Sequence, residues 1–488
     1  MKLSLSWIKD FVNIPEDMDL KQLAYDLTMS TVEVEDVEDL ARRFDNMVVG
    51  VIEKIEAHPN ADKLRVCKVD IGDGEIKDIV CGGINLEEGM RVAVSCPGAA
   101  VRWHGEGEPV VIKNSKLRGV ESYGMICASD EIGLGDLFPA EREAEILDLS
   151  AFDVPAGTPL ADALDMNDVL LEIDNKSMTN RPDLWGHYGI AREIAALYNL
   201  KLKEIEPFET DVQSDFHVEI LDPDRCTRYI GVEMSGVAVK PSPYKMQNRI
   251  WKAGMRPINA LVDITNYVML ATGNPTHAFD ADNITDHIVV RHAAEGEKLV
   301  LLNDKELSLC PDDLVITDSE GPVALAGVMG GAKDSILPKT QRVILEVANF
   351  EAAGIRRTAL RYDTRTEASS RYEKAIDPER CDQALALSMK YFRELYPELK
   401  VTGYCDQYVK KLEKAQIDVS LTWLEKRLGK HLTEDEIQGC LGRLGFEVAI
   451  SGDNMHVTAP AWRSTGDISI KDDVMEEVAR MYGYDHFD

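Results

Sequence analysis

The chain of 488 residues carries 54 Lys and Arg against 86 Asp and Glu, which gives a formal net charge of −32 at pH 7. This length exceeds what one hydrophobic core supports, so we expect roughly three or four domains. The acidity argues against indiscriminate binding to nucleic acid or anionic membranes, and confines any RNA-binding face to a small basic area. No apolar run is long enough to span a bilayer.

The cysteines and the N-terminus indicate a cytoplasmic protein. Nine cysteines include no Cys-x-x-Cys pair, and an odd count without metal spacing is typical of reduced thiols. The first residues, MKLSLSWIKDFVNI, have neither an uninterrupted apolar stretch nor a small-residue cleavage site. They therefore do not read as a signal peptide.

The first half of the chain changes from a short helical start to a region of β-strands. Trp7, Ile8 and Phe11 recur at helical spacing. Between residues 48 and 147, short β-runs separated by Gly and Pro predict a small barrel, whose open face and loops suit oligonucleotides. Six cations would contact phosphates there, although charge alone leaves an ordinary surface equally possible: Lys63, Arg65, Lys68, Lys113, Lys116 and Arg118.

A helical pattern returns between Asp183 and Tyr198, and we interpret this element as structural because Pro182 and Asp183 are ordinary helix-start residues. A charged connector near residues 201–215 marks a boundary. A larger α/β region follows to about residue 396. In the last 90 residues, Thr433 and Glu436 frame a capping box for a helix.

The segment from Arg256 to Asp280 mixes an apolar helical run with polar residues that amphipathic periodicity does not require, namely Asn259, Asp263, Thr265 and Asn266. Buried polar groups are costly unless hydrogen-bonded, so such a segment either forms a polar network or lines a pocket. The run breaks at Gly-Asn-Pro and then presents His277. A buried helix with a satisfied core histidine is the plain alternative, but the number of polar groups favours a pocket wall.

Three later strings add candidate site residues. PVALAGVMGG runs into Gly327 and Gly330, where a backbone can approach a ligand closely, although a simple turn is the default explanation. VILEVANF carries a single carboxylate, Glu346, which must be exposed, paired or functional. RTEASSRYEKAIDP places Thr366 and Ala368 where a loop enters a helix.

These strings together resemble one family. RPINALVDITNYV, NPTHAFD, ALAGVMGG, ILEVANF and RTEASSRYEKAIDP resemble, in order, the editing region of the β-subunit of bacterial phenylalanine–tRNA ligase. The barrel, with its PNADKL and SYGM loops, resembles a tRNA-binding domain. The MKLSLSWI start, the NRPDLWGHYGIARE helix and the final WRSTGDISIKDDVMEEVARMYGYD fit the same subunit. The resemblance covers essentially the whole chain and is specific because the strings occur in combination.

The resemblance implies a multidomain α+β fold. An oligonucleotide-binding (OB) β-barrel at 41–148 is expected inside an N-terminal α/β domain made of 1–40 with 150–200. An α/β editing domain (B3/B4) at 213–398 and a small C-terminal α+β, helix-turn-helix-like (B5) domain at 405–480 follow. Residues 481–488 are expected to begin a further domain, so we interpret the chain as a fragment of a longer subunit.

The resemblance also implies an activity. The family enzyme is an α2β2 heterotetramer that uses ATP and Mg²⁺ to attach phenylalanine to tRNA(Phe), with the synthetic site on the α-subunit. The β-subunit binds tRNA and hydrolyses tyrosine wrongly attached to it. This chain is thus expected to be a cytoplasmic ligase subunit with hydrolase activity, with an α-subunit and tRNA(Phe) as partners and no membrane or DNA role.

The positions that match the family's editing pocket are Arg256, His277, Gly327, Gly330, Glu346, Thr366 and Ala368. Glu346 would accept a hydrogen bond from the tyrosine hydroxyl, while the glycines and Ala368 would leave room for the ring. His277 and Arg256 would orient the acyl-adenosine end. Thr366 is preferred to Thr364 as the hydroxyl that faces the substrate. No Ser-His-Asp or Cys-His pattern is visible, so no covalent nucleophile is expected.

An acidic group near the C-terminus matches the family's metal site: Asp467, Asp473, Glu476 and Glu477. On spacing alone, an acidic first turn that favours the helix dipole is the better explanation. The resemblance instead favours Mg²⁺ held jointly with the α-subunit, with ATP as a substrate of the whole enzyme. Two rival interpretations of the chain stay open, a non-catalytic RNA-binding or scaffolding protein and a hydrolase of free aminoacyl esters.

Overall fold

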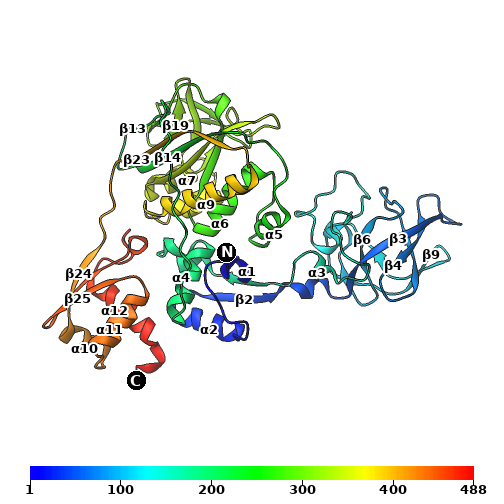
Figure 1. Cartoon of the computed structure of the whole chain (residues 1–488), viewed down its shortest axis with the longest axis horizontal. Coiled ribbons are helices and arrows are strands. Elements are labelled where there is room, and N and C mark those ends of the chain that lie inside the picture. The colour runs from blue at the N-terminus through cyan, green and yellow to red at the C-terminus, as the bar shows by residue number, and fades with distance from the viewer. Residues whose placement is uncertain (488) are drawn as a thin grey trace. The chain divides into compact units, whose positions relative to one another are not determined.

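The computed structural model describes residues 1–487. The chain divides into two compact units, of which the smaller comprises residues 38–170 and 254–257 and the larger comprises the rest (Figure 1). None of the helices within residues 1–487 combines the length and the apolar character that a membrane crossing requires. All nine cysteines are free thiols.

The smaller unit contains a five-stranded antiparallel sheet with the strand order β11-β6-β3-β4-β5. Its strands are β3 (Met47–Ala57), β4 (Arg65–Asp70), β5 (Ile76–Cys81), β6 (Arg91–Ser95) and β11 (Met125–Ile126). The two edge strands contact each other, and Tyr123 N donates a hydrogen bond to Asp78 O at 2.8 Å. The sheet therefore nearly closes on itself, as predicted for a small barrel, with alternate apolar side chains such as Ile52 and Val69 in its core.

Short strands and a helical turn complete the smaller unit. They are β7 (Ala100–Val101), β8 (Val110–Val111), β9 (Ser115–Leu117), β10 (Val120–Ser122) and α3 (Leu160–Ala163). The compact unit begins and ends outside the 41–148 range expected for the barrel domain, since it extends to residue 170. The specific OB topology stays a prediction.

The larger unit begins with a three-stranded sheet of order β1-β12-β2 and three helices. These elements are β1 (Lys2–Ser4), β12 (Val169–Ile173), β2 (Val34–Asp39), α1 (Leu5–Ile8), α2 (Leu20–Ser30) and α4 (His187–Leu197). Trp7 is fully buried and stacks on the rings of His187 and Tyr267, with centroids 3.9 and 4.4 Å away. The predicted short helical start is therefore confirmed, and its apolar face anchors it in the fold.

The central part of the larger unit holds two sheets. The four-stranded sheet has the order β15-β22-β14-β23, and the five-stranded sheet has the order β13-β16-β19-β20-β21. Their strands are β13 (Val218–Ile220), β14 (Cys226–Ser235), β15 (Thr276–Asp280), β16 (Ile288–His292), β19 (Leu314–Asp318), β20 (Gly321–Leu325), β21 (Met329–Gly330), β22 (Arg342–Phe350) and β23 (Lys400–Tyr408). A hairpin of β17 (Lys298–Val300) and β18 (Glu306–Ser308) lies beside them.

Five helices surround these sheets: α5 (Tyr244–Lys252), α6 (Ala260–Thr272), α7 (Ala352–Arg361), α8 (Glu367–Tyr372) and α9 (Arg380–Leu395). Helices α6 and α9 pack together, and they contact β15 and β22 of the four-stranded sheet (Figure 1). A continuous apolar core joins residues of both sheets, including Phe279, Ile316 and Ile344. This core fixes the ends of β15, β20 and β22, where the candidate site lies.

The C-terminal part is a small α+β module. A sheet of order β24-β26-β25 carries three helices. The elements are β24 (Gln416–Ser420), β25 (Glu447–Ser451), β26 (Asn454–Thr458), α10 (Leu421–Leu428), α11 (Glu434–Arg443) and α12 (Lys471–Tyr482). Thr433 caps α11 by accepting a hydrogen bond from Glu436 N at 3.1 Å, which confirms the predicted start of that helix. A helix-turn-helix-like arrangement stays a prediction.

A buried ionic network joins this module to the first part of the larger unit. Arg181 pairs with Asp183 and Glu193, and Arg480 pairs with Glu193 and Glu477. Arg463 extends the network to Glu477 and Asp467. All seven side chains are nearly inaccessible to solvent, so each charge depends on its neighbours for compensation. The structural interpretation of the Asn-Arg-Pro-Asp segment is therefore confirmed.

Candidate functional site

His277 and Glu346 lie side by side at the edge of a narrow cavity. Strand β15 pairs antiparallel with β22, and this pairing sets His277 directly opposite Glu346. Residues that face each other in such a pair project from the same side of the sheet. The cavity between them and the neighbouring loops has a volume of about 60 Å³. Two segments separated by about 70 residues thus bring an imidazole and a carboxyl group together at the cavity.

Mostly glycines and apolar residues form the rest of the wall, which comprises Pro275, Thr276, the 324–330 segment, Phe350, Ala368 and Tyr372. The hydroxyls of Thr276 and Tyr372 donate to backbone carbonyl oxygens. Gly327 has a φ of +69°, and a Cβ there would lie within about 3 Å of the side chains of Ile355 and Phe350. These steric limits explain why this turn needs a glycine.

Gly330 supports the imidazole of His277. A Cβ atom at Gly330 would lie 2.5 Å from His277 Cε1 and 2.7 Å from His277 Nε2. The ring also meets Phe279 edge to face, with centroids 4.5 Å apart. The absence of a side chain at Gly330 therefore lets the imidazole lie against β21 and face the cavity.

Glu346 is buried without a complete set of hydrogen-bond partners. It is 6% exposed, and its Oε1 atom has no partner within residues 1–487. Burial, and secondarily the nearby charge of Asp334, raise the pKa of Glu346 from 4.5 to about 8. The carboxyl group is therefore protonated at neutral pH, so it can both donate and accept a hydrogen bond.

His277 is neutral at the same pH. Burial lowers the pKa of its imidazole from 6.5 to about 4. In the part of the chain that the structure describes, no residue forms a hydrogen bond with its ring nitrogens. The two titratable groups that face each other in the cavity, His277 and Glu346, are thus uncharged at neutral pH. Such a site can recognise a neutral hydroxyl and exclude a charged one.

Asp334 is a residue that sequence reasoning missed. It is fully buried, and neither of its carboxylate oxygens has a hydrogen-bond partner among residues 1–487. Burial raises its pKa to about 8. A Cβ at Gly331 would lie 3.1 Å from its Oδ1 atom, which places the carboxyl group behind the glycine segment. An aspartate shortly after Gly-Gly is typical of an ordinary turn, so the sequence gives no sign that Asp334 is buried.

Thr366 and Thr364 hold loops in place and do not line the cavity. Thr366 caps α8, accepts a hydrogen bond from Ser369 N at 3.0 Å and donates one to Val328 O at 2.8 Å. Thr364 is buried and donates to Tyr362 O at 3.0 Å. Of the predicted loop, only Ala368 lines the cavity. Thr366 therefore fixes the position of Val328 and of α8.

Arg256 belongs to the smaller unit, whereas every residue that lines the cavity belongs to the larger one. The side chain of Arg256 is 65% exposed, and its guanidinium lies 3.7 Å from the carboxylate of Asp136, within the smaller unit. Gly254, with a φ of +91°, precedes it in the short segment that belongs to that unit. The predicted role of Arg256 in orienting the acyl-adenosine end stays a prediction.

The polar residues of α6 also differ from the prediction of a pocket wall. Asn259 caps α6 by accepting a hydrogen bond from Val262 N, and Thr265 donates to Val262 O. Asp263 accepts from Ile258 N at 2.7 Å and from Ser242 Oγ at 2.6 Å. These groups stabilise the helix internally, and only the residues after the helix, from Pro275 to His277, reach the narrow cavity.

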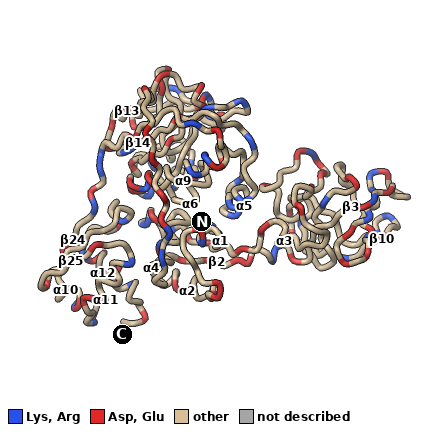
Figure 2. The backbone as a smooth tube through the Cα atoms, in the orientation of Figure 1, with Lys and Arg blue, Asp and Glu red and all other residues tan. Residues whose placement is uncertain are grey.

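Three of the six barrel cations lie on neighbouring loops. His58 Nε2 donates to Leu117 O at 2.9 Å and Asn60 Nδ2 donates to Arg118 O at 3.0 Å. These bonds join the loop that carries Lys63 to the hairpin that carries Lys116 and Arg118, where cations gather near β10 (Figure 2). All three residues and Lys113 are exposed.

The other two cations serve the barrel itself. Lys68 pairs with Asp78 at 2.7 Å. Arg65 is half-buried and directs its guanidinium to the carbonyl oxygens of Gly83 and Leu86. A phosphate would have to displace these internal partners, so the exposed loop cations form the better candidate nucleic-acid interface.

Three of the four predicted metal ligands near the C-terminus have partners within this chain. Asp467 and Glu477 are both paired with Arg463. Asp473 Oδ2 accepts hydrogen bonds from Ser469 N at 2.8 Å and Ile470 N at 2.9 Å, and so caps α12. Within residues 1–487, no group of three or more His, Cys, Asp or Glu side chains is placed to share a metal ion.

Three family models match the chain in sequence order. A putative tRNA binding domain matches residues 47–158, a B3/4 domain matches residues 225–397 and a tRNA synthetase B5 domain matches residues 417–484. The residues that line the narrow cavity all lie within the B3/4 match. The exposed cations of the smaller unit lie within the match to the putative tRNA binding domain.

Relatives match over the whole chain. The sequence is 38% identical to the phenylalanine–tRNA ligase beta subunit of Oceanobacillus iheyensis over 494 residues, and 39% identical to that of Halalkalibacterium halodurans over 491 residues. Each alignment covers 100% of this chain and 60% of the relative, so the chain spans about 60% of their length.

A solved structure of an N-terminal fragment of the phenylalanyl-tRNA synthetase beta subunit from Pyrococcus horikoshii is 19% identical. It covers 65% of this chain and 88% of that one, with a TM-score of 0.35, which is too low to support an argument about the fold. The resemblance predicted from the motifs is confirmed by the sequence relatives and the three matched domains.

Proposed function

We propose that this chain, a relative of phenylalanine–tRNA ligase beta subunits along its whole length, hydrolyses tyrosine that has been wrongly esterified to tRNA(Phe). The observation that carries the proposal is the pairing of His277 with Glu346 across β15 and β22, in a cavity with glycine walls. Both side chains are uncharged at neutral pH, which suits a site for a neutral phenol.

Discrimination between tyrosine and phenylalanine follows from hydrogen bonding. The protonated carboxyl group of Glu346 can donate a hydrogen bond to a phenolic hydroxyl or accept one from it. A phenylalanine ring has no hydroxyl and cannot form this bond. An unpaired buried polar group costs about 1–3 kcal/mol, so each such group lowers the affinity for phenylalanine about five- to 150-fold. Gly327 and Gly330 line the cavity, and a side chain at either position would displace the residues that shape it, His277 among them.

The reaction is hydrolysis of an ester. A water oxygen bonds to the carbonyl carbon, the bond from that carbon to the ribose oxygen breaks, and the ribose oxygen receives a proton. The products are free tyrosine and tRNA. His277 faces the cavity and is assigned to orienting the acyl-adenosine end. Water activation is assigned to no residue, and no covalent intermediate is proposed.

The rest of the proposal concerns the whole enzyme. Lys63, Lys113, Lys116 and Arg118 would contact phosphates of tRNA(Phe) from the exposed loops of the smaller unit. An α-subunit in an α2β2 assembly would carry the synthetic site and use ATP, in the cytoplasm. Mg²⁺ held jointly with that subunit stays a prediction. No step is routed through it, because Asp467 and Glu477 are already paired with arginine.

Glu346→Ala tests the assignment directly. We expect the variant to hydrolyse Tyr-tRNA(Phe) at a rate close to that for Phe-tRNA(Phe), a loss of selectivity of about tenfold or more, because the hydrogen bond to the phenol is lost. The measurement is single-turnover release of labelled amino acid. Glu306→Ala, at an exposed glutamate of β18, is the matched control and should keep the selectivity of the parent chain.

The outcomes separate the rival functions. If the parent chain binds Tyr-tRNA(Phe) without turnover, a scaffolding role replaces the proposal. Equal activity on free tyrosyl esters would indicate a hydrolase of free aminoacyl esters. Unchanged selectivity in Glu346→Ala, with hydrolysis intact, would remove Glu346 from the recognition of tyrosine.

A further inference from the structure

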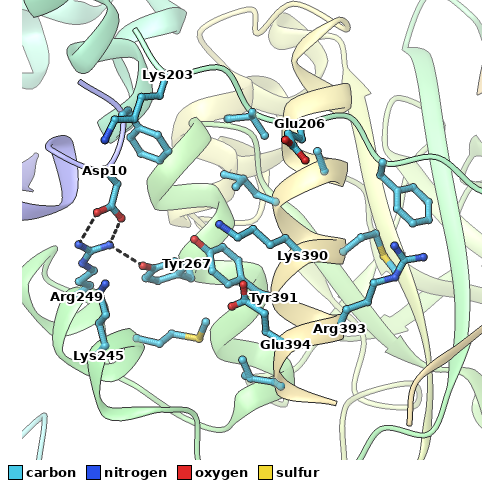
Figure 3. Close-up of a pocket in the computed structure, with 18 of the residues that line it drawn as sticks. Asp10, Lys203, Glu206, Lys245, Arg249, Tyr267, Lys390, Tyr391, Arg393 and Glu394 are labelled. Atoms are coloured by element: carbon cyan, nitrogen blue, oxygen red, sulfur yellow. Dashed lines mark hydrogen bonds and ion pairs between the residues drawn. The ribbon is translucent and has the colours of Figure 1, made fainter. Parts of the chain in front are cut away.

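A second cavity in the larger unit has a volume of about 860 Å³ (Figure 3). Its walls are the end of α1, the connector at 203–208, and helices α5, α6 and α9. It shares no lining residue with the narrow cavity beside Glu346. The volume lies within the range of about 300–1,000 Å³ that is typical of small-molecule sites.

Cations converge on this cavity from four separate segments. Lys9, Lys203, Lys245 and Lys390 line it, and none of them forms an ion pair with a carboxylate within residues 1–487. The chain as a whole has a net charge of −32, so this gathering of unpaired ammonium groups runs against the general composition. A concave surface with several free cations raises the local concentration of anions.

The floor of the cavity is rigid and polar. Arg249 is buried, pairs with Asp10 through both of its terminal nitrogens, and donates a hydrogen bond to Tyr267 Oη at 3.0 Å. The ring of Tyr391 meets that of Tyr267 edge to face, with centroids 5.0 Å apart and planes at 90°. Figure 3 shows Tyr391 and Lys390 together at the centre of the view. The tyrosine rings are thus held by the network beneath them.

Carboxylates line the same cavity beside the cations. Glu204, Glu206 and Glu394 belong to its wall, and none of them forms an ion pair with a residue that the structure describes (Figure 3). A ligand that carries only negative charge would use the lysines but be repelled by these groups. An apolar ligand would use the rings but leave every charged group without a partner. The occupant must therefore combine an anion, a flat ring and hydrogen-bond donors.

We propose that this cavity binds a nucleoside phosphate, either as a free nucleotide or as one nucleotide of an RNA strand. The lysines contact the phosphate, as compact point charges commonly do. An aromatic ring such as Tyr391 stacks on the base. Glu206 and Glu394 accept hydrogen bonds from ribose hydroxyls or exocyclic amines, a role that carboxylates fill in dinucleotide sites. This site is independent of the proposed hydrolysis at Glu346.

Equilibrium titration of the full chain with ADP, and with a single-stranded RNA trinucleotide, tests the proposal. The double variant Lys203→Glu/Lys390→Glu should weaken binding at least about tenfold, because two phosphate contacts become repulsive. Tyr391→Ala should weaken it about fivefold or more through the loss of stacking. The matched control is Lys21→Glu/Lys426→Glu, which reverses two exposed lysines outside the cavity and should leave the affinity unchanged.

The two ligands identify the source of the nucleotide. Binding of both would indicate a strand of RNA, whereas binding of ADP alone would indicate a free nucleotide. The proposal is overturned if neither ligand binds at about 1 mM, or if the lysine variant binds as tightly as the control.

Photolabelling of the unmodified chain with azido-ADP provides a second measurement that does not depend on any variant. Peptide mass spectrometry should place the label within 203–208 or 386–395. Labels confined to other segments would also overturn the proposal. Deacylation of Tyr-tRNA(Phe), measured in the same variants, should stay at the rate of the parent chain. Failure at this site is therefore distinguishable from failure at Glu346.

Discussion

The two cavities of the larger unit both contain glutamate, but its side chain is buried in the narrow cavity and exposed in the wide one. In the narrow cavity, Glu346 is buried, lacks a partner for one oxygen and keeps its proton at neutral pH. In the wide cavity, Glu206 and Lys390 are exposed to water. Space differs as well, with about 60 Å³ in one cavity and about 860 Å³ in the other. Burial, more than residue type, therefore decides what each cavity can recognise.

The difference has a direct chemical meaning. A dry, uncharged cavity gains its selectivity from the cost of leaving a buried group unpaired, which acts over single hydrogen bonds. A wet, charged cavity gains affinity from the field of several ions and discriminates less sharply between ligands. Three substitutions or changes of condition should affect one cavity and not the other.

The largest expected effect is that of Gly330→Ala. The new Cβ atom would lie 2.5 Å from His277 Cε1, so the imidazole must move. We expect hydrolysis of Tyr-tRNA(Phe) to fall about 100-fold, since a shift of about 1 Å in an orienting group has effects of this size. Single-turnover deacylation measures the loss, and titration with ADP should show no change at the wide cavity.

Gly439→Ala is the control for this substitution, because a Cβ at that position of α11 meets nothing within 4 Å. It should retain full activity. Normal hydrolysis by Gly330→Ala would mean that the position of His277 is unimportant. The narrow cavity would then not depend on exact geometry, and this difference from the wide cavity would be wrong.

An intermediate effect is expected on the pH dependence of stability. Burial raises the pKa of Glu346 to about 8 from a value of 4.5 in the unfolded chain. Its contribution to stability is therefore fully present below about pH 4.5 and is lost as the pH rises through about 8. Glu346→Gln has no carboxyl group to titrate at this position. Between about pH 4.5 and about pH 8, the parent chain should therefore lose stability relative to the variant, by up to about 1.4 kcal/mol for each pH unit.

Urea unfolding of both proteins between about pH 5 and about pH 9 measures this difference. Asp334 is present in both proteins, so its own raised pKa largely cancels from the comparison. Parallel stability curves would show that Glu346 is ionised in the folded chain, and the description of the narrow cavity as uncharged would be wrong.

The smallest effect is that of salt. Raising the ionic strength from about 50 to about 200 mM should weaken ADP binding about threefold, because exposed charges are screened over about 10 Å. Once tRNA is bound, single-turnover hydrolysis in the narrow cavity should change little, since its two polar groups are neutral. Equal salt sensitivity of both measurements would contradict the distinction between the cavities.

The sequence predicted the part of the site that depends on short, unusual strings. A single carboxylate in an apolar strand led to Glu346, and the glycine-rich run led to Gly327 and Gly330. The small barrel and the helix capped by Thr433 followed from local patterns that the structure confirms. The Thr433 cap depends on residues three positions apart. Gly330 and Glu346 are constrained by the distant His277, but the unusual strings around them still mark them in the sequence.

The sequence could not predict features that depend on distant partners. Asp263 resembles a pocket residue until its bond from the hydroxyl of Ser242, 21 residues away, is seen. Asp467 and Glu477 look like metal ligands until Arg463 is placed between them.

The wide cavity left no trace in the sequence at all. Its lysines come from segments as far apart as residues 9 and 390, and no motif connects them. The assignment of the segment around Arg256 to the smaller compact unit likewise follows from no local pattern.

The buried ionic network around Glu193 constrains how this sequence can change over time. Arg181, Arg480 and Arg463 alternate with four carboxylates, and nearly every member serves two neighbours. Loss of Arg181 would leave Asp183 without its arginine, and loss of Arg463 would leave Asp467 without one, each at a cost of about 3–5 kcal/mol. A substitution of either arginine therefore requires a compensating substitution of the carboxylate that it pairs with.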